Sequence, residues 1–542
     1  MKEALKVGVI LDGQTVNRWV YQLLEEIIAS EYANIVTVVY ADIDQVNSSQ
    51  KKLPQAYKFH CWIDKLVFRR RAALSQRVNL GRLLQDVPDL IIYPRHIRLQ
   101  VGDWQGELDV LLNFSSLVVH DPKAQLARFG MWRFSVDDQQ DESCASSCYW
   151  EMVNHDPVID LSLRCTNSDL KNEIVVHRSK LPVNYNSVCV NQHQVYSVGK
   201  LVILRLLKGI FNFGPDYLYR QANKYDQSVF MVKNAERLPD SNYQALANLL
   251  RVCWRYLHLH LTYRSRWRWF LNFRIDGSPF PYLSGAYQSL VPPADRFWAD
   301  PFVVSRSSKI FVFVEEFIYR AKKGHISVLE LNNDGKLIGI EKILEKPYHL
   351  SYPFVFEFAD SYYMIPETSE NETIELYRCV RFPNKWSFVV NLMERVNAVD
   401  TTLLFHNGMW WLFTAINQLP EFPDHRELFL FYANHLFATE WTAHPSNPIV
   451  TDVHTARPAG KIFRSENRIY RPSQDCAGRY GRAFSLNEIT VLNEQEYAEQ
   501  TVLKCEADWK SKLGGTHTFN FDKGITLIDV YKFYKRFDFY SI

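Results

Sequence analysis

Continuous apolar runs of strand length alternate with helical patterns in the first part of the chain. Residues 5–13 read as a buried strand that ends in a turn, residues 17–33 repeat apolar side chains at helical spacing, and residues 34–42 read as a second buried strand. A strand, a helix and a strand in this order predict a parallel sheet with a right-handed crossover. Residues 88–94 and 108–114 add two more buried strands. No G-x-G-x-x-G motif is present, so the dinucleotide-binding fingerprint is absent.

The second half of the chain changes to short strands that open on a polar or aromatic residue followed by Pro or Thr. Examples are "WADPFVV", "LSYPFVF" and "AVDTTLLF". Five such openings recur at intervals of 48 to 60 residues, at Asp300, Tyr352, Asp400, Arg457 and His517. Repeats of about 40–50 residues, each holding several short strands, are typical of propeller blades.

The second strands of these repeats also align, after turns such as "HNG" and "SEN". The alignment puts Glu315, Glu367, Ala415 and Gln474 at one level. Because the first strand of each blade lines the central channel of a propeller, the five opening residues are predicted to form a ring, with a second layer at this level.

The predicted fold is therefore multidomain. An N-terminal α/β domain with a parallel sheet covers residues 1–200, a helical connector covers 201–265, and an all-β five-bladed propeller covers 266–542. Residues 243–275 mix Arg with Trp, Tyr and Leu, and we interpret them as a connecting helix that leads into a strand. Peripheral membrane contact by residues 245–275 is the alternative, which we do not favour, since stable attachment needs a second anchoring signal.

Composition adds mainly exclusions. The net charge of +2 indicates no nucleic-acid partner, and no stretch is apolar enough to cross a bilayer. Cys144 and Cys148 lack a second pair at zinc-site spacing, so we expect no metal and no cofactor. Without a signal-peptide pattern, the expected location is cytoplasmic, with reduced cysteines.

Residues 126–165 resemble the catalytic domain of methionyl-tRNA and sugar-nucleotide formyltransferases. The resemblance is carried by the strand before "LLNF", by "ARFGMWRF" and by "YWEMVNHDPVIDLSL". That family uses an Asn, a His and an Asp. Asn113 lies near the family's strand, but the turn that should carry the His reads "FSVDDQQD". Without an imidazole there is no general base for the attacking amine, so we expect a degenerate formyltransferase-like domain.

From about Asp295 to the end, the chain resembles the N-terminal region of plant glucosamine inositolphosphorylceramide transferases. It also resembles bacterial proteins that fuse this region to a formyltransferase-like domain. The matching stretches include "DRFWADPFVV", "VDTTLLFHNGMWWLF" and "HPSNPIVTDVHTARPAGKIF". The plant glycosyltransferase module lies beyond this region, so the resemblance does not imply glycosyl transfer. The propeller itself is similar to five-bladed arabinanase and furanosidase glycoside hydrolases.

That similarity, with the ring of polar residues, predicts a site for a carbohydrate or sugar-containing small molecule and suggests glycoside hydrolysis by paired carboxylates. Asp300 is the candidate base and Glu367 the candidate acid, with Asp400 holding the acid's proton or orienting the sugar. The candidate substrate-binding residues are Glu315, Tyr352, Arg457, Arg471, Gln474 and His517. The arginines would bind a phosphate or carboxylate, because their forked donors match those anions.

Two other functions stay open. The chain could be a non-catalytic glycan-binding scaffold, in which the polar residues tie blades together. Alternatively, the N-terminal domain could transfer a formyl group to an amino sugar that the propeller recognises, although the missing His speaks against it.

Overall fold

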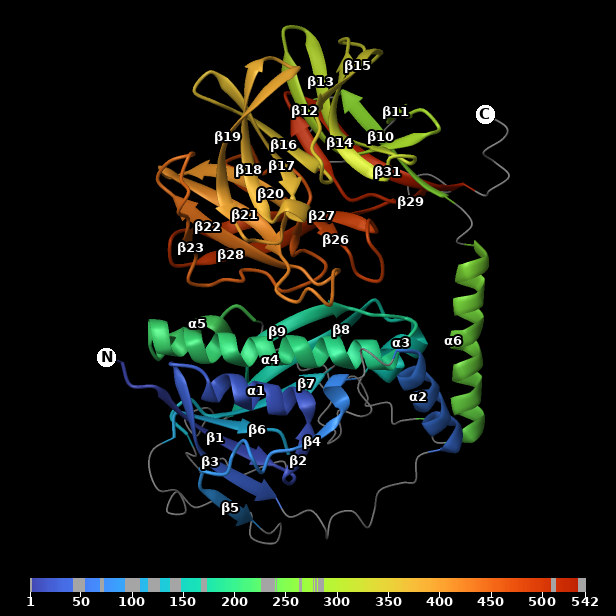
Figure 1. The fold of residues 1–542 in the computed structure, drawn as a ribbon. Coiled ribbons are helices and arrows are strands. Elements are labelled where there is room, and N and C mark those ends of the chain that lie inside the picture. Colours follow the sequence, from blue (N-terminus) through green and yellow to red (C-terminus); the bar gives the residue numbers. More distant parts are fainter. Residues whose placement is uncertain are drawn as a thin grey trace. The chain divides into compact units, whose positions relative to one another are not determined.

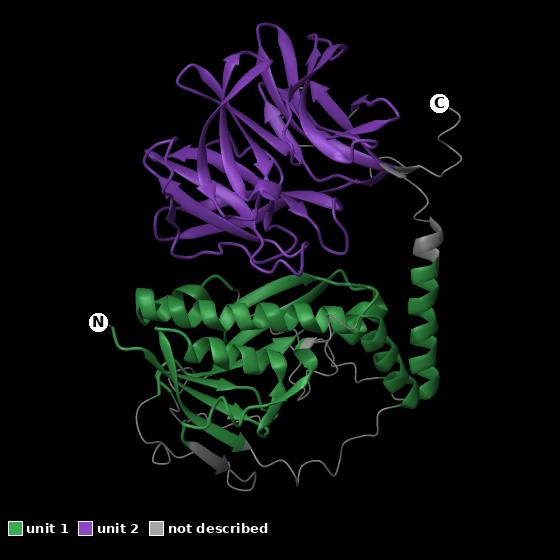
Figure 2. Ribbon diagram, in the orientation of Figure 1, with its two compact units in different colours: residues 1–257 green, residues 258–542 purple. Residues whose placement is uncertain are grey.

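The computed structural model describes residues 2–41, 54–68, 73–92, 108–115, 127–136, 148–166, 173–225, 239, 241–262, 266–275, 277, 280, 287–507 and 513–534. The chain divides into two compact units, Met1–Leu257 and His258–Ile542 (Figures 1 and 2). Among the described helices, none combines the length and hydrophobicity that a bilayer-spanning segment needs.

Unit 1 is built around one seven-stranded sheet in the order β5-β3-β1-β6-β7-β8-β9. Neighbours from β5 to β7 run parallel, as the sequence predicts, whereas β8 and β9 extend the sheet antiparallel. The strands are β1 (Leu5–Leu11), β3 (Ala33–Ala41), β5 (Asp89–Ile92), β6 (Val110–Asn113), β7 (Met131–Val136), β8 (Val158–Thr166) and β9 (Ile174–Pro182), with a small separate pair β2 (Thr15–Asn17) and β4 (Arg77–Asn79). The sheet is therefore mixed.

The helices of unit 1 are α1 (Arg18–Ile28), α2 (Gln55–Val67), α3 (Tyr149–Asn154), α4 (Val188–Phe213), α5 (Asp216–Ala222) and α6 (Asn242–Thr262), the last of which continues past the end of the unit. Helices α1, α4 and α5 contact strands of the sheet, whereas α2, α3 and α6 pack against one another around Tyr57, Tyr149 and Val252. The sequence of α1 has the pattern of an amphipathic helix. Its apolar residues recur at helical spacing and are all buried: Trp19, Val20, Leu23, Leu24 and Ile27. Helix α4 runs without a break across residue 200.

The predicted formyltransferase-like centre is described only in part. Asn113 ends β6 and is buried, with its Oδ1 accepting a hydrogen bond from the Ser115 hydroxyl at 2.7 Å. Strand β6 lies beside β1, where the strand order reverses, which is where open α/β sheets bind ligands. Residues 137–147, which include most of the altered turn and Cys144, lie outside the described residues. The formyl-transfer alternative therefore stays a prediction.

Unit 2 is the predicted five-bladed β-propeller. Four blades follow one another along the chain, each a meander of antiparallel strands. Blade 1 holds β12 (Arg296–Arg306), β13 (Lys309–Ile318), β14 (Lys323–Leu331) and β15 (Leu337–Leu344). Blade 2 holds β16 (Ser351–Phe358), β17 (Ser361–Thr368), β18 (Thr373–Arg381) and β19 (Lys385–Glu394). Blade 3 holds β20 (Ala398–His406), β21 (Met409–Ile416), β22 (Glu427–Ala433) and β23 (Thr442–Ala443). Blade 4 holds β24 (Arg457–Pro458), β25 (Phe463–Ser465), β26 (Arg468–Asp475), β27 (Ala483–Leu492) and β28 (Tyr497–Glu506).

Blade 5 closes the ring with strands from both ends of unit 2. It combines β10 (Arg266–Ile275) and β11 (Gln288–Leu290) with β29 (Leu513–Gly515), β30 (Phe519–Asp522) and β31 (Ile525–Tyr534). Strands β10 and β31 pair antiparallel over ten residues, from Arg266↔Tyr534 to Ile275↔Ile525. This pairing joins the first and last strands of unit 2 in one sheet, so the ring of blades is closed around its axis.

Candidate functional site

Three blades open with the same backbone irregularity. In blade 1, Ala299 pairs with Glu315 and Phe302 with Phe313, so Asp300 and Pro301 together face one residue. The same two-against-one bulge recurs at Tyr352 and at Asp400. Bulges bend a strand and re-aim a side chain, and they are enriched beside functional sites.

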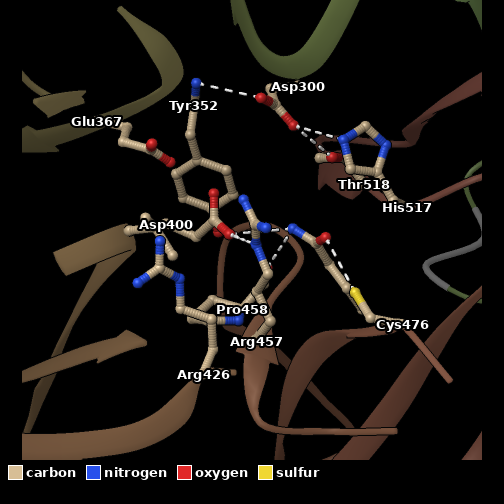
Figure 3. Close-up of polar contacts among 12 residues, drawn as sticks. Asp300, Tyr352, Glu367, Asp400, Arg426, Arg457, Pro458, Cys476, His517 and Thr518 are labelled. Atoms are coloured by element: carbon tan, nitrogen blue, oxygen red, sulfur yellow. Dashed lines mark hydrogen bonds and ion pairs between the residues drawn. The ribbon is translucent and has the colours of Figure 1, made fainter. Parts of the chain in front are cut away.

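The bulged residues all have a left-handed backbone. The φ angles are 49° at Asp300, 42° at Tyr352 and 54° at Asp400. This region costs a non-glycine residue about 1 kcal/mol or more, so the surrounding structure must hold it. Their three side chains meet in the region that Figure 3 shows, together with groups from blades 4 and 5. The predicted convergence of these three blade openings is therefore seen in the structure.

Asp300 is almost fully buried and has several hydrogen-bond donors around it. The Thr518 hydroxyl donates to its Oδ1 at 2.9 Å, and the backbone N–H of Tyr352 donates to its Oδ2 at 3.3 Å. The His517 Nε2 lies 3.2 Å from Oδ1. Burial alone would raise the pKa of Asp300, but His517 and Thr518 outweigh it and hold that pKa below its usual value. Asp300 is therefore an ionised carboxylate.

His517 lies between two carboxylates. Its Nδ1 is 2.8 Å from Oδ2 of Asp529, which is fully buried on β31. Asp529 also accepts the backbone N–H groups of His517, Thr518 and Asp300 at 3.0, 2.9 and 3.1 Å. Burial would lower the pKa of His517, but the charges of Asp529 and Asp300 raise it to about 10. At neutral pH this imidazole is a buried cation that joins blades 1 and 5.

Asp400 has a different set of neighbours. The Arg457 Nε donates to its Oδ2, and the Gln474 amide donates to the same oxygen at 3.1 Å. Burial raises the pKa of Asp400, and although Arg457 opposes this, the charges of Glu367 and Asp300 bring it to about 7. Asp400 can therefore take up or release a proton near neutrality.

Two glutamates of the predicted second layer lie near these aspartates. Glu315 pairs with Ala299 in blade 1, and Glu367 pairs with Ser351 in blade 2, so both stand at the level predicted from the alignment. Burial, followed by the charges of Asp300 and Glu367, raises the pKa of Glu315 well above its usual value, which favours the protonated form of this carboxyl group.

Glu367 is only half-buried, and the Ser369 hydroxyl donates to its Oε1 at 2.8 Å. Figure 3 shows its carboxylate beside the Tyr352 ring, directed toward Asp400. Tyr352 itself is buried, and its hydroxyl lies 2.9 Å from that of Thr402 in blade 3. Glu367 is thus the carboxylate of this cluster with the most access to solvent.

Arg471 is not brought together with the other predicted residues. Its guanidinium makes a two-point contact with Glu499, with Nε–Oε2 at 2.7 Å, and donates to the Thr455 carbonyl at 2.8 Å. Side chains alternate along a strand, so Arg471 projects from the face of β26 opposite to Gln474. Its interactions hold blade 4 together.

Four residues of the site were missed in the sequence. Asp529 and Thr518 surround Asp300, as described above. Arg426 contributes a guanidinium whose Nη1 donates to Asn397 at 2.8 Å, while its buried Nε has no partner among the described residues. Tyr480, 43% exposed, lies under the Arg457 guanidinium at 5.0 Å from the ring centroid.

One group of side chains has the donor set of a metal site. One ligand atom each from Asp300, His517 and Asp529 lies within 4.8 Å of the others. Carboxylate oxygens with one imidazole suit several divalent cations. A cation there would have to displace the imidazole proton, which the same two carboxylates stabilise.

Fold and site together define a class of protein: a five-bladed β-propeller with acidic and basic side chains gathered at its axis. Residues 280–523 match the family model described as "Glucosamine inositolphosphorylceramide transferase 1, N-terminal". The resemblance predicted from the sequence is thereby confirmed for this part of the chain.

Individual relatives show the same resemblance. The glucosamine inositolphosphorylceramide transferase 1 of Oryza sativa subsp. japonica is 34% identical over 212 residues, which cover 38% of this chain and 28% of that protein. The Arabidopsis thaliana protein of the same name is 30% identical over 235 residues, covering 42% and 30%. The chain thus spans less than a third of the length of these relatives.

Solved structures similar to this chain include Zg3597, a family 117 glycoside hydrolase of Zobellia galactanivorans, at 10% identity and a TM-score of 0.33, covering 49% of this chain and 90% of the other. Another is the catalytic domain of the Coprinopsis cinerea GH62 α-L-arabinofuranosidase, at 12% identity and a TM-score of 0.31, covering 43% and 90%.

Proposed function

We propose that the propeller axis binds a sugar and that this chain cleaves a glycosidic bond there with paired carboxylates. The observation that supports this most is the split in protonation among neighbouring carboxyl groups. Asp300 has a lowered pKa, Asp400 has a pKa of about 7, and Glu315 has a pKa well above its usual value. Glycoside hydrolysis needs one ionised and one protonated carboxyl group on either side of the scissile bond.

In the proposed reaction, Asp300 accepts a proton from a water molecule whose oxygen forms a new bond to the anomeric carbon. As the glycosidic C–O bond breaks, the leaving oxygen takes up a proton that Asp400 holds near pH 7 and that reaches it through the neighbouring, more exposed Glu367 carboxyl group. The Tyr480 ring offers an exposed apolar face for a sugar ring, next to Arg457.

The substrate proposed is a sugar linked to an anionic group. The name of the plant relatives refers to glucosamine and to inositolphosphorylceramide. Arg426 and Arg457 interact electrostatically with each other and with Glu367 and Asp400. Guanidinium groups at this position would favour a phosphate or carboxylate on the substrate.

A second candidate is a glycan-binding protein without catalysis. Asp300 is only 4% exposed, and its carboxylate oxygens already face Thr518, Tyr352 and His517. A base needs a free lone pair directed at the attacking water, and these contacts compete for it.

Substitution of Asp300 separates the two candidates. The full chain is assayed with p-nitrophenyl glycosides of common aldoses, hexosamines and uronic acids, and with glucosamine-inositol phosphates. Hydrolysis by the wild type and a loss of about 10²–10⁴-fold in kcat for Asp300→Asn, with sugar binding retained, support catalysis. Sugar binding without turnover in either protein supports the second candidate, and no binding by the wild type contradicts both.

A further inference from the structure

Helix α6 carries an uninterrupted exposed apolar stripe. Tyr243, Leu246, Leu250, Trp254 and Leu257 follow one another at spacings of three and four residues, so they share one helix face. Each of these side chains is between 49% and 84% exposed. A surface helix of a globular protein normally turns such a stripe toward the core.

The core-facing side of α6 is a different set of residues. Ala245, Asn248 and Val252 are buried, and the Asn248 amide donates to the Tyr149 hydroxyl at 3.2 Å. Arg255 donates to the Met152 carbonyl at 3.0 Å. These contacts fix the rotation of α6 about its axis, so the stripe is held away from the unit 1 core.

Helix α2 adds a second exposed apolar row. Phe59, Trp62 and Leu66 lie one turn apart and are 52–59% exposed, with the Phe59 and Trp62 rings stacked at 5.9 Å. The Asn242 side chain at the start of α6 accepts the backbone N–H of Ala56 at 3.0 Å, which joins the two helices. Figure 1 shows α2 beside the first half of α6.

The exposed charges on these two helices are all positive. Lys58, Lys65 and Arg251 are exposed, and α6 contains no acidic residue. The one acidic residue of α2, Asp64, is buried and accepts the backbone N–H of Cys189 at 2.8 Å. Lys and Arg beside Trp, Phe and Leu are the composition of helices that lie in a bilayer interface.

We propose that the α2–α6 face, defined by these exposed side chains, binds the surface of a bilayer that contains anionic lipids. Trp62, Trp254 and Tyr243 are amphipathic side chains of the kind that settle at headgroup level. Apolar burial and cationic attraction supply two signals, as stable peripheral attachment requires. A symmetric dimer through this face fits less well, because it would bring Lys58, Lys65 and Arg251 against their own copies with no exposed acid on either helix to pair with them.

Vesicle flotation of the full chain tests the proposal. Vesicles of phosphatidylcholine with about 30% phosphatidylserine should carry the wild type, whereas pure phosphatidylcholine should carry at least tenfold less. The double variant Leu250→Gln/Trp254→Gln should lose tenfold or more of the binding to anionic vesicles. Lys58→Glu/Lys65→Glu should lose a similar amount without altering the apolar stripe. Val380→Ser, which removes a 63% exposed apolar side chain from the propeller, should bind as the wild type does.

Three results would overturn the proposal. The first is absence of wild-type binding to anionic vesicles, and the second is equal binding by both double variants and the wild type. The third is a wild-type dimer in sedimentation analysis that Leu250→Gln/Trp254→Gln converts to a monomer, without vesicle binding. That last result would assign the face to a second copy of this chain. Circular dichroism of each variant checks that the helices are retained.

Discussion

Asp300 and Asp400 occupy the same position in blades 1 and 3, yet their surroundings give them opposite acidities. Both sit in the two-against-one bulge with a left-handed φ, and both are almost fully buried. The pKa of Asp300 is lowered, whereas that of Asp400 is raised to about 7. The blade repeat therefore sets where each carboxylate lies but does not set its protonation.

The difference comes from the blades that each aspartate faces. Asp300 meets His517, whose positive charge is itself held by Asp529 of blade 5. Asp400 meets Arg457 and Gln474 of blade 4, but it also lies in the field of Glu367 and Asp300. A repeat fold can thus place equivalent carboxyl groups at one axis and use the neighbouring blades to divide acid from base.

The largest expected effect is on stability, from Asp529→Asn. This change leaves the His517 cation with one carboxylate instead of two, and breaking a buried charge cluster costs about 3–5 kcal/mol. Calorimetry of the full chain should show the propeller transition at a markedly lower temperature. Lys342→Gln, which breaks an exposed pair with Glu345, is the control and should cost less than about 1 kcal/mol. Equal effects of the two changes would refute the assigned role of Asp529.

Arg457→Met should cost less, about 1–3 kcal/mol, although it also removes a charge partner. Without Arg457 the pKa of Asp400 rises further, so the carboxyl group becomes neutral instead of remaining a buried anion. Denaturant titration at pH 5 and pH 9 checks this, since the destabilisation should be larger at pH 9. A cost as large as that of Asp529→Asn at both pH values would show that the two aspartates are equivalent after all.

His517 and Asp400 both make the folded chain less stable as pH rises, because the pKa of each is raised on folding. His517 has a pKa of about 10 in the folded chain against about 6.5 unfolded, so its contribution is lost as pH rises from about 6.5 to 10. Asp400, with a pKa of about 7 in the folded chain against about 4 unfolded, lowers the free energy of unfolding as pH rises from about 4 to 7. Each group changes the unfolding free energy by at most about 1.4 kcal/mol per pH unit. Melting curves between pH 7 and 10 should fall less steeply for His517→Gln; an unchanged slope would contradict a charged His517.

A smaller effect separates two substitutions of Asp300. Asn tolerates the left-handed region better than Ala does, so Asp300→Ala should be less stable than Asp300→Asn by about 1 kcal/mol. Both changes remove the charge, but Ala also removes the oxygen that accepts a hydrogen bond from the Thr518 hydroxyl, so the difference contains this lost hydrogen bond as well as the backbone contribution. Equal melting temperatures would mean that neither of the two contributes.

The sequence predicted much of this arrangement because the propeller repeats its signals. Asp300, Tyr352 and Asp400 could be found from the Pro or Thr that follows each of them, and Glu315 and Glu367 from the alignment of second strands. The sequence could also have excluded Arg471 from the site. Side chains alternate between the two faces of a strand, so Arg471 and Gln474, three residues apart, point in opposite directions.

Other residues gave no usable signal. Asp529 lies inside the run "ITLIDVYKFY", which reads as an ordinary core strand, and its role depends on pairing across a gap of more than 200 residues with Asp300. Arg426 lies in the segment between β21 and β22, where the spacing of residues does not predict in which direction a side chain points. The exposed face of α6 was visible as a helical pattern, but the sequence alone could not decide which of its two apolar sides packs inward.

Sugar binding at the propeller axis is the claim that a thermal-shift titration tests most directly. Wild type, Glu367→Ala and Val380→Ser are heated with glucosamine, glucosamine-inositol phosphates and a panel of aldose and uronic-acid oligosaccharides. A ligand present at about 100 times its Kd should raise the propeller transition of the wild type and Val380→Ser by roughly 5–10 °C and that of Glu367→Ala by much less. No shift with any sugar, or an equal shift in Glu367→Ala, would contradict a sugar site at the axis.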